Sequence, residues 1–190
     1  MLEGRAVNLR IVEKDDIDFM MDCFNQLDFW GEFDPLLSQR SKTARLREFD
    51  NPSQLTVLTE RTWFVIEKKD GTKIGFIGHW FVQPNKWMEI GYGLIPSERG
   101  KGYATEAVQI IIDYLFLSRN IMRIQAVTDV KNKASQRVLE KTGFQREGII
   151  RKSAFAGLKL IPFRSRHLGS DACFEILQRM RKELEGKIDI

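Results

Sequence analysis

The sequence has few of the residues that mark several common classes of protein. Of its 190 residues only Cys23 and Cys173 are cysteines, with no Cys-x-x-Cys motif or histidine cluster beside them. Neither a disulfide scaffold nor a zinc site is therefore indicated, and both thiols are expected to be buried spectators. No apolar run approaches the roughly 18 residues that cross a membrane, and the first residues lack the layout of a secretion signal. We expect a cytoplasmic protein without membrane contact or bound metal.

The chain also lacks a strong charge of one sign. Lysine and arginine number 30 against 26 aspartate and glutamate, and this +4 excess is spread along the chain. It gives no support for direct nucleic-acid binding, which we do not expect. A weak basic balance suits a solvated mixed-charge surface and equally an enzyme whose ligand carries several phosphates. The length and the hydrophobic share of 43% suit one compact domain over residues 1–190.

Apolar alternation predicts antiparallel strands in the first half of the chain. Strands are expected at 7–11, 63–67, 73–82 and 86–95, with Asp70-Gly71 as a two-residue hairpin turn. Asp15 or Asp16 is expected to cap a helix that follows the first strand, and Ser41 a second, short helix.

Helices and strands alternate in the second half. The i, i+3, i+4, i+7 spacing predicts a helix over 103–116, followed by a strand at 121–128 and a short helix from about Asn132 to Gly143. Two final strands at 148–155 and 171–177, joined by an irregular stretch, and a helix over 178–185 complete the prediction. The order suggests an α/β (α+β) fold with a mixed, mostly antiparallel central sheet flanked by helices.

Residues 90–105 run from a strand through a glycine-rich loop into a helix. Such a junction binds anions, because a helix N-terminus presents unpaired N–H groups and glycines let a phosphate approach the backbone. Arg99 and Lys101 add positive charge. A P-loop would need glycine and Ser or Thr where the chain has Ile95 and Gly102, and Pro96 breaks the Rossmann fingerprint. A nucleotide triphosphatase and a dinucleotide-binding enzyme are therefore disfavoured.

Several segments of the sequence resemble one enzyme family. Arg99-x-x-Gly102-x-Ala104 resembles the (Gln/Arg)-x-x-Gly-x-(Gly/Ala) signature of the GNAT superfamily of N-acetyltransferases. Residues 132–135 and 140–144 are similar to its Asn-x-x-Ser and Gly-Phe block. Residues 30–33 and 89–92 resemble the RimJ/RimL-like branch, the ribosomal-protein alanine acetyltransferases. With the order of elements, the resemblance covers nearly all of the chain.

The resemblance implies a GNAT-type fold and transfer of an acetyl group from acetyl-CoA to a primary amine. It implies direct attack in a ternary complex, without a metal or a covalent enzyme intermediate. The loop would cradle the pyrophosphate. The residues expected to contact the coenzyme are Leu94, Ile95, Arg99, Gly100, Lys101, Gly102, Tyr103, Ala104, Thr105 and Asn132.

Glu89 is the candidate general base. Strand periodicity places it on one face with Trp87, Gly91 and Gly93, where the glycines should leave room for a ligand, and opposite an apolar core face. Amines with a pKa of roughly 8 to 10 are mostly protonated at neutral pH, so the acceptor must lose a proton before it attacks a thioester. The alternative is a surface glutamate that only solubilises the strand.

Ser135 is the candidate acid for the departing thiolate. Many relatives carry a tyrosine where this chain has Leu139, whereas the RimL-like branch has a serine at position 135. The alternative is an ordinary serine in the first turn of a helix. Ala154 is a second departure, because it stands where the RimL-like enzymes have the glutamate proposed as their base. This departure puts their mechanism and substrate in doubt here.

The candidate acceptor-binding residues are Trp30, Phe33 and Glu89, and Phe29 is a further candidate for the wall of the acceptor pocket. The alternative for the three aromatic residues is a core position under a loop. By branch resemblance the acceptor is a protein N-terminal α-amine. A polyamine or amino-sugar acceptor, and a non-catalytic acyl-CoA sensor, remain as alternatives. A monomer or a homodimer is expected.

Overall fold

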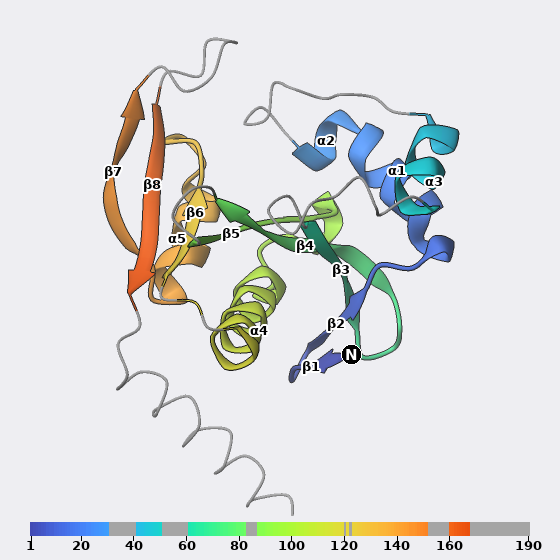
Figure 1. Cartoon of the computed structure of the whole chain (residues 1–190), viewed down its shortest axis with the longest axis horizontal. Coiled ribbons are helices and arrows are strands. Elements are labelled where there is room, and N and C mark those ends of the chain that lie inside the picture. Colours follow the sequence, from blue (N-terminus) through green and yellow to red (C-terminus); the bar gives the residue numbers. More distant parts are fainter. Residues whose placement is uncertain are drawn as a thin grey trace, which may run out of the picture.

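A mixed sheet forms the centre of the molecule (Figure 1). The computed structural model describes residues 1–30, 41–50, 61–82, 87–119, 121, 123–151 and 160–167. Within these ranges the strands are β1 (Leu2–Glu3), β2 (Val7–Ile11), β3 (Arg61–Lys68), β4 (Lys73–Val82), β5 (Trp87–Leu94), β6 (Arg123–Val127), β7 (Gln145–Arg151) and β8 (Leu160–His167). Their spatial order is β1-β2-β3-β4-β5-β6-β8-β7. Only the β5–β6 pair among them is parallel, which confirms the predicted mixed, mostly antiparallel sheet.

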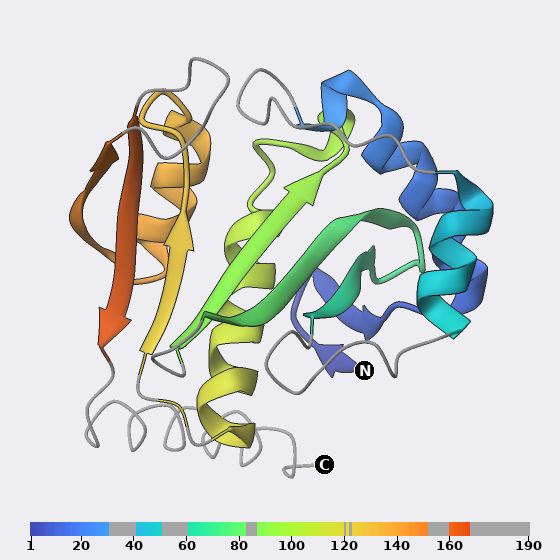
Figure 2. The same ribbon diagram turned by 45° about the horizontal axis from the view of Figure 1, so that its top comes forward.

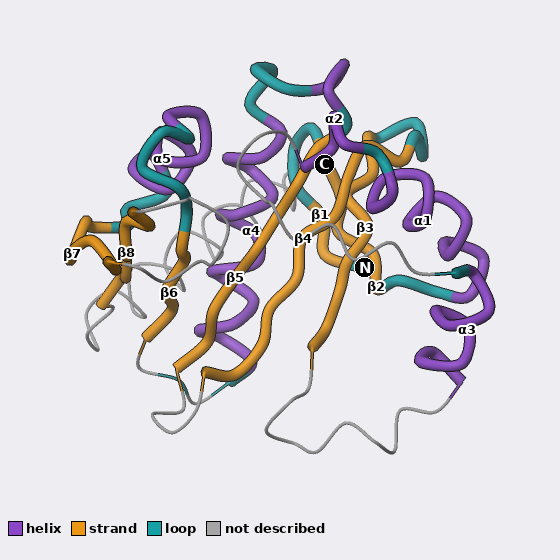
Figure 3. Tube along the Cα trace, turned by 90° about the horizontal axis from the view of Figure 1, so that it is seen from above, coloured by secondary structure: helices purple, strands orange, loops and turns teal. Residues whose placement is uncertain are grey.

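Helices cover both faces of the sheet (Figure 3). The described helices are α1 (Ile17–Asn25), α2 (Leu27–Trp30), α3 (Lys42–Asp50), α4 (Tyr103–Ser118) and α5 (Lys133–Lys141), with short 3₁₀ turns at Lys14–Asp16 and Pro96–Glu98. Helix α4 and Leu139 of α5 pack on one face, in a core with Leu9, Ile66 and Met88. Helix α1 packs on the other face, against Val65 and Phe76. None of the described helices has the length and apolar character of a membrane span.

Helix α4 forms as its apolar spacing predicts. Its buried residues are Ala107, Val108, Ile111, Ile112 and Leu115, all at 0% exposure. Burying one such isoleucine or leucine stabilises the fold by about 1.5–3 kcal/mol, so this stripe fastens α4 to the sheet. The start of the helix, at Tyr103, is thereby held at the end of the loop that follows β5.

One turn and one helix cap differ in detail from the prediction, and a second cap forms as expected. The β3–β4 hairpin closes with Lys68 N–H donating to Thr72 O, so the loop has three residues, with Gly71 at φ +83°. Ser41 caps α3 as expected, since its Oγ accepts from Ala44 N–H at 3.2 Å. Asp16 is the N-cap of α1, but its side chain makes no capping bond.

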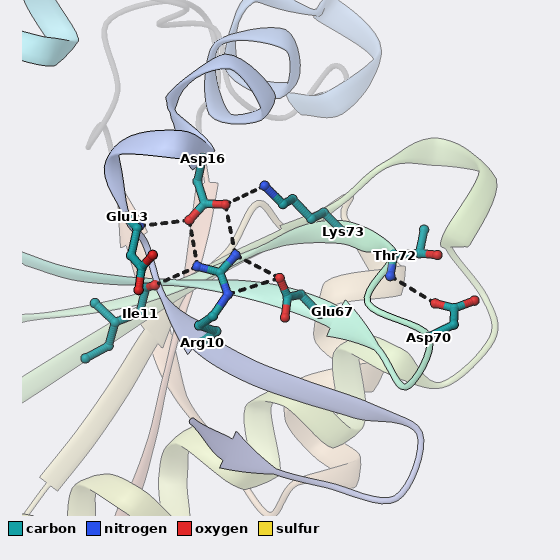
Figure 4. Close-up of polar contacts among 8 residues, drawn as sticks. All are labelled: Arg10, Ile11, Glu13, Asp16, Glu67, Asp70, Thr72 and Lys73. Carbon is teal, nitrogen blue, oxygen red and sulfur yellow. Dashed lines mark hydrogen bonds and ion pairs between the residues drawn. The ribbon is translucent and has the colours of Figure 1, made fainter.

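Asp16 instead belongs to a buried ionic cluster that joins β2, β3 and β4 to the start of α1 (Figure 4). Its carboxylate accepts two hydrogen bonds from Arg10 at 2.9 Å, one from Lys73 at 2.6 Å and one from Glu13 N–H at 2.8 Å. Arg10 also donates to Glu67 at 2.8 Å. Burial alone would raise the pKa of Asp16, but the bonds from Arg10 and Lys73 lower it by more, to well below its usual range.

The end of the chain differs most from the prediction. Strand β7 occupies 145–151 instead of 148–155, and β8 lies at 160–167, where an irregular stretch was expected. Pro162 and the charged residues around it disfavour a strand locally. The strand forms because it pairs with β6 on one side and β7 on the other. The predicted strand at 171–177, the helix at 178–185 and Cys173 lie outside the described residues, while Cys23 is buried as expected.

Candidate active site

Strands β5 and β6 separate beside Glu89. Their registered pairs are Met88 with Ile124 and Glu89 with Gln125, and no later pair is present in the described part of either strand. Beyond that point β5 stays paired with β4 as far as Leu94. Figure 2 shows the two strands close at one end and diverging toward the end where β5 runs into the loop before α4. The β6-facing backbone edge of residues 90–94 can therefore pair with an extended ligand.

The glycine-rich loop lies at the diverging end of β5. Gly100 and Gly102 have left-handed φ values of +76° and +90°, which other residues adopt only with strain. Gly102 is the N-cap of α4 and contributes no side-chain cap to the N–H groups of the first turn. A Cβ added at either glycine would meet nothing within 4 Å. The first turn, with Tyr103, Ala104 and Thr105, thus presents its N–H groups in an open place that suits a phosphate.

The two loop cations make contacts within the protein. Arg99 donates from Nε to Leu94 O at 3.0 Å, and from one terminal nitrogen to Asp28 O at 2.7 Å and Phe29 O at 2.8 Å. Lys101 Nζ donates to Glu98 at 3.0 Å. Arg99 therefore ties the end of β5 to α2. The features of the loop that suit an anion are therefore its backbone N–H groups, with Lys101 as a nearby exposed charge.

Asn132 and Ser135 lie together at the start of α5. Asn132 Oδ1 caps the helix by accepting from Ser135 N–H at 3.0 Å, which leaves the amide NH₂ group outside the cap. The hydroxyl of Ser135 lies 3.0 Å from the hydroxyl of Tyr92 on β5. The Tyr92 hydroxyl also lies 3.2 Å from Ser135 O, a second possible acceptor for its one proton. Burial, opposed by the Ser135 hydrogen bond, raises the pKa of Tyr92 to about 12.

Glu89 lies where β5 and β6 part. Its Oε2 accepts a hydrogen bond from Nε2 of Gln125, which is 5% exposed, at 2.7 Å. The sequence predicts room for a ligand beside Gly91 and Gly93, and this prediction is wrong. A Cβ at Gly91 would lie 2.9 Å from the ring of Trp80, and one at Gly93 would lie 2.9 Å from the ring of Phe29. Both glycines are required because aromatic rings pack directly on the strand.

Only part of the predicted wall of the acceptor pocket lies among the described residues. Phe29 is 5% exposed and packs with Phe24 at 5.9 Å between ring centroids, so it is a core aromatic residue. Trp30 is the last residue of α2, and Phe33 lies outside the described residues, as does Ala154. Their roles stay predictions. No group of three or more metal-binding side chains gathers within the described ranges.

Sequence reasoning missed three residues of this site. Tyr92 alternates onto the apolar face of β5, where strand periodicity predicts only a core residue, and no local pattern distinguishes Trp80 from other strand aromatic residues. Gln125 carried a usable signal, because a glutamine between Ile124 and Ala126 in a buried strand needs a polar partner.

Comparison with known proteins decides the family. Residues 7–145 match the acetyltransferase (GNAT) domain family. The chain belongs to the GNAT family. The resemblance to this family is thereby confirmed.

Several relatives of this GNAT chain carry acetyltransferase names. The probable N-acetyltransferase YjcK of Bacillus subtilis is 30% identical over 161 residues, covering 80% of this chain and 88% of the relative. A ribosomal-protein-serine acetyltransferase of Escherichia coli is 34% identical over 93 residues, covering 48% of this chain and 51% of the relative. The chain spans about half the length of several other curated relatives that it matches.

Solved structures share the fold. A RimL ribosomal L7/L12 α-N-protein acetyltransferase in complex with coenzyme A superposes with a TM-score of 0.75 at 17% identity, covering 89% of this chain and 97% of the other. A spermidine N-acetyltransferase from Vibrio cholerae, in complex with CoA and spermine, has a TM-score of 0.71 at 20% identity, with 86% and 96% covered. At these identities the likeness establishes the fold and leaves the acceptor open.

Proposed function

We propose that this GNAT-family chain transfers the acetyl group of acetyl-CoA to a primary amine, and that the amine is a protein N-terminal α-amine. The observation that carries the proposal is the coincidence of two features at one end of the sheet. The open N-terminus of α4 at Gly102 adjoins the end of β5 that has separated from β6. An anion site beside an unpaired strand edge suits a long ligand with a pyrophosphate at one part and an amide-containing arm at another.

The coenzyme would lie with its pyrophosphate against the N–H groups that begin α4, and with its arm along the free edge of β5. Leu94 is the last residue of β5, and Leu94 and Ile95 lie at the end of that edge. Both are held in place, because Leu94 O accepts from Arg99 and Ile95 N–H donates to Ile74 O at 2.9 Å. Asn132 would contact the arm through its amide NH₂ group. In this scheme Arg99 shapes the loop and holds α2, while the backbone binds the phosphates.

Glu89 and Ser135 are proposed to supply the acid–base chemistry. The Glu89 carboxylate takes a proton from the acceptor ammonium, directly or through water, and the freed nitrogen attacks the thioester carbon. A backbone N–H late in β5 stabilises the oxyanion that forms. The nitrogen then loses its second proton to solvent, and the C–S bond breaks with its electron pair on sulfur. The Ser135 hydroxyl gives the thiolate a proton that it regains from solvent. The hydrogen bond from Gln125 fixes the Glu89 carboxylate in position.

The choice of acceptor rests on resemblance to named relatives. The ribosomal-protein-serine acetyltransferase and the RimL structure favour a protein N-terminus. The spermidine acetyltransferase structure supports a polyamine as the second candidate. An α-amine has a pKa of roughly 8, against about 10.4 for a lysine-like amine, so it needs less help from a base at neutral pH. We further propose that the enzyme works in the cytoplasm as a monomer or homodimer.

A thiol-release assay tests this function. The protein is mixed with acetyl-CoA and, in separate wells, with peptides bearing free or blocked N-termini, spermidine and an amino-sugar, and free CoA is measured over time. The proposal expects release that depends on a free peptide N-terminus. Faster release with spermidine would move the acceptor to the polyamine class. Tight acetyl-CoA binding with no release for any amine would indicate a non-catalytic sensor.

A further inference from the structure

Tyr92 and Ser135 form a contact across the gap between β5 and α5. Tyr92 comes from β5, three residues beyond the last β5–β6 pair at Glu89, and Ser135 from the first turn of α5, after β6. Their hydroxyls are 3.0 Å apart, and the Tyr92 hydroxyl is 3.2 Å from Ser135 O. Strand β5 and the helix that follows β6 are therefore joined through the Tyr92 phenol.

The count of protons in this contact allows two arrangements. Each hydroxyl has a single proton, and either oxygen can be the donor between them. If Tyr92 donates to Ser135 O, its oxygen is free to accept the Ser135 proton, and the serine proton points toward the tyrosine. If Tyr92 donates to Ser135 Oγ, the serine proton is left free to point elsewhere.

We infer that Tyr92 is a positioning residue, which donates to Ser135 Oγ and so directs the serine proton to the thiolate of departing CoA. This inference rests on the proposed function and deepens it. In the second arrangement Ser135 gives its proton to sulfur as the C–S bond breaks, and the Tyr92 hydrogen bond stabilises the negative oxygen until solvent returns a proton. Tyr92 keeps its own proton throughout. The burial that raises its pKa to about 12 keeps it a neutral donor at neutral pH.

The test measures the pKa of the thiol of bound CoA as well as the turnover rate. A donor aimed at sulfur stabilises the thiolate, so it lowers the pKa of the bound thiol, which can be titrated by its ultraviolet thiolate absorption. Tyr92→Phe removes only the phenol oxygen. We expect it to raise the bound thiol pKa by about one unit and to lower kcat about tenfold, with little change in acetyl-CoA affinity. Tyr114→Phe, on α4, is the matched control and should change neither quantity.

A double-mutant cycle that combines Tyr92→Phe with Ser135→Ala shows whether Tyr92 acts through Ser135 or stabilises the thiolate independently of it. If Tyr92 acts through Ser135, the double variant should be no slower than Ser135→Ala alone, because the tyrosine then has nothing to position. Losses that multiply would overturn the inference. An unchanged thiol pKa and an unchanged kcat in a folded Tyr92→Phe variant would overturn it as well.

A second substitution keeps the test decisive if Tyr92→Phe does not fold. Fluorotyrosine placed at position 92 has almost the same shape but is a stronger hydrogen-bond donor. It should lower the pKa of the bound thiol below that of the natural enzyme, and a purely structural tyrosine would leave that value unmoved. If CoA binds and its thiol responds to these changes but no amine is ever acetylated, the proposed function fails while the positioning role stands.

Discussion

Replacing Gly102 by leucine separates the anion-binding role of the loop from its role in folding. The Gly102 backbone has φ +90°, and a Cβ there would project into open space. The folded state should therefore lose only about 1–2 kcal/mol, the cost of a left-handed residue with a side chain. For a protein of this size that loss lowers Tm by roughly 2–8 °C.

The effect on acetyl-CoA should be much larger. A leucine side chain at the start of α4 would occupy the space that a phosphate needs to reach the N–H groups of the first turn. Each charge-assisted hydrogen bond lost costs about 1.5–3 kcal/mol, so losing two weakens binding by roughly 10²- to 10⁴-fold. Calorimetry measures the affinity for acetyl-CoA, and thermal unfolding with and without acetyl-CoA measures the change in Tm.

Gly71→Leu is the matched control. Gly71 also has a left-handed φ, +83°, and open surroundings, but it lies in the β3–β4 hairpin. It should lose a similar amount of stability and keep its affinity for acetyl-CoA. A folded Gly102→Leu protein with the natural affinity would refute the assignment of the loop, and so would an equal loss of affinity in Gly71→Leu.

Three further predictions concern the base and two buried ionisable groups. Glu89→Gln should lower turnover roughly 10²- to 10⁴-fold at neutral pH with acetyl-CoA affinity unchanged, and the same exchange at exposed Glu3 should have no effect; a rate equal to that of the natural protein would remove Glu89 as the base. Asp16→Asn should lower the free energy of unfolding by about 2–3 kcal/mol at pH 7, less than for a fully buried pair because Arg10 and Lys73 are partly exposed. Because the folded pKa of Asp16 is depressed, this difference should be complete above about pH 4 and shrink as the pH falls, and denaturation curves showing a constant difference from pH 7 to pH 2 would contradict it. His79 is 2% exposed and neither ring nitrogen has a partner among the described residues, and burial, with the charge of Arg119, lowers its pKa to about 4. The unfolded chain therefore binds the proton first as the pH drops from 6.5 to 4, so His79→Phe should be more stable than the natural protein over that range, and an unchanged slope of stability against pH would count against this reading.

Local pattern was enough to predict the parts of the site that a short stretch of chain determines. The apolar stripe of α4 needs only its own spacing, and Gly102 is needed because the backbone before the helix turns left-handed. The cap of Asn132 on α5 likewise lies within four residues. Strand alternation also placed Glu89 correctly on the face opposite the buried residues Met88, Ile90 and Leu94.

Contacts between distant segments determined the rest. Arg99 has the spacing of the family signature, but its guanidinium meets the carbonyls of Asp28 and Phe29, which no local pattern indicates. The rings of Phe29 and Trp80 occupy the room beside the β5 glycines for the same reason.

Patterns within short stretches of the chain were enough to predict where the helices and most strands lie and that the chain belongs to the GNAT family. Those features depend on periodicity, backbone conformation and motif spacing, which are local. Only the tertiary structure decided that β8 pairs on both sides, that β5 and β6 part beside Glu89, and that Tyr92 meets Ser135. Each of these depends on which donor reaches which acceptor once the chain is folded, because a hydrogen bond acts over about 3 Å in space irrespective of separation along the sequence.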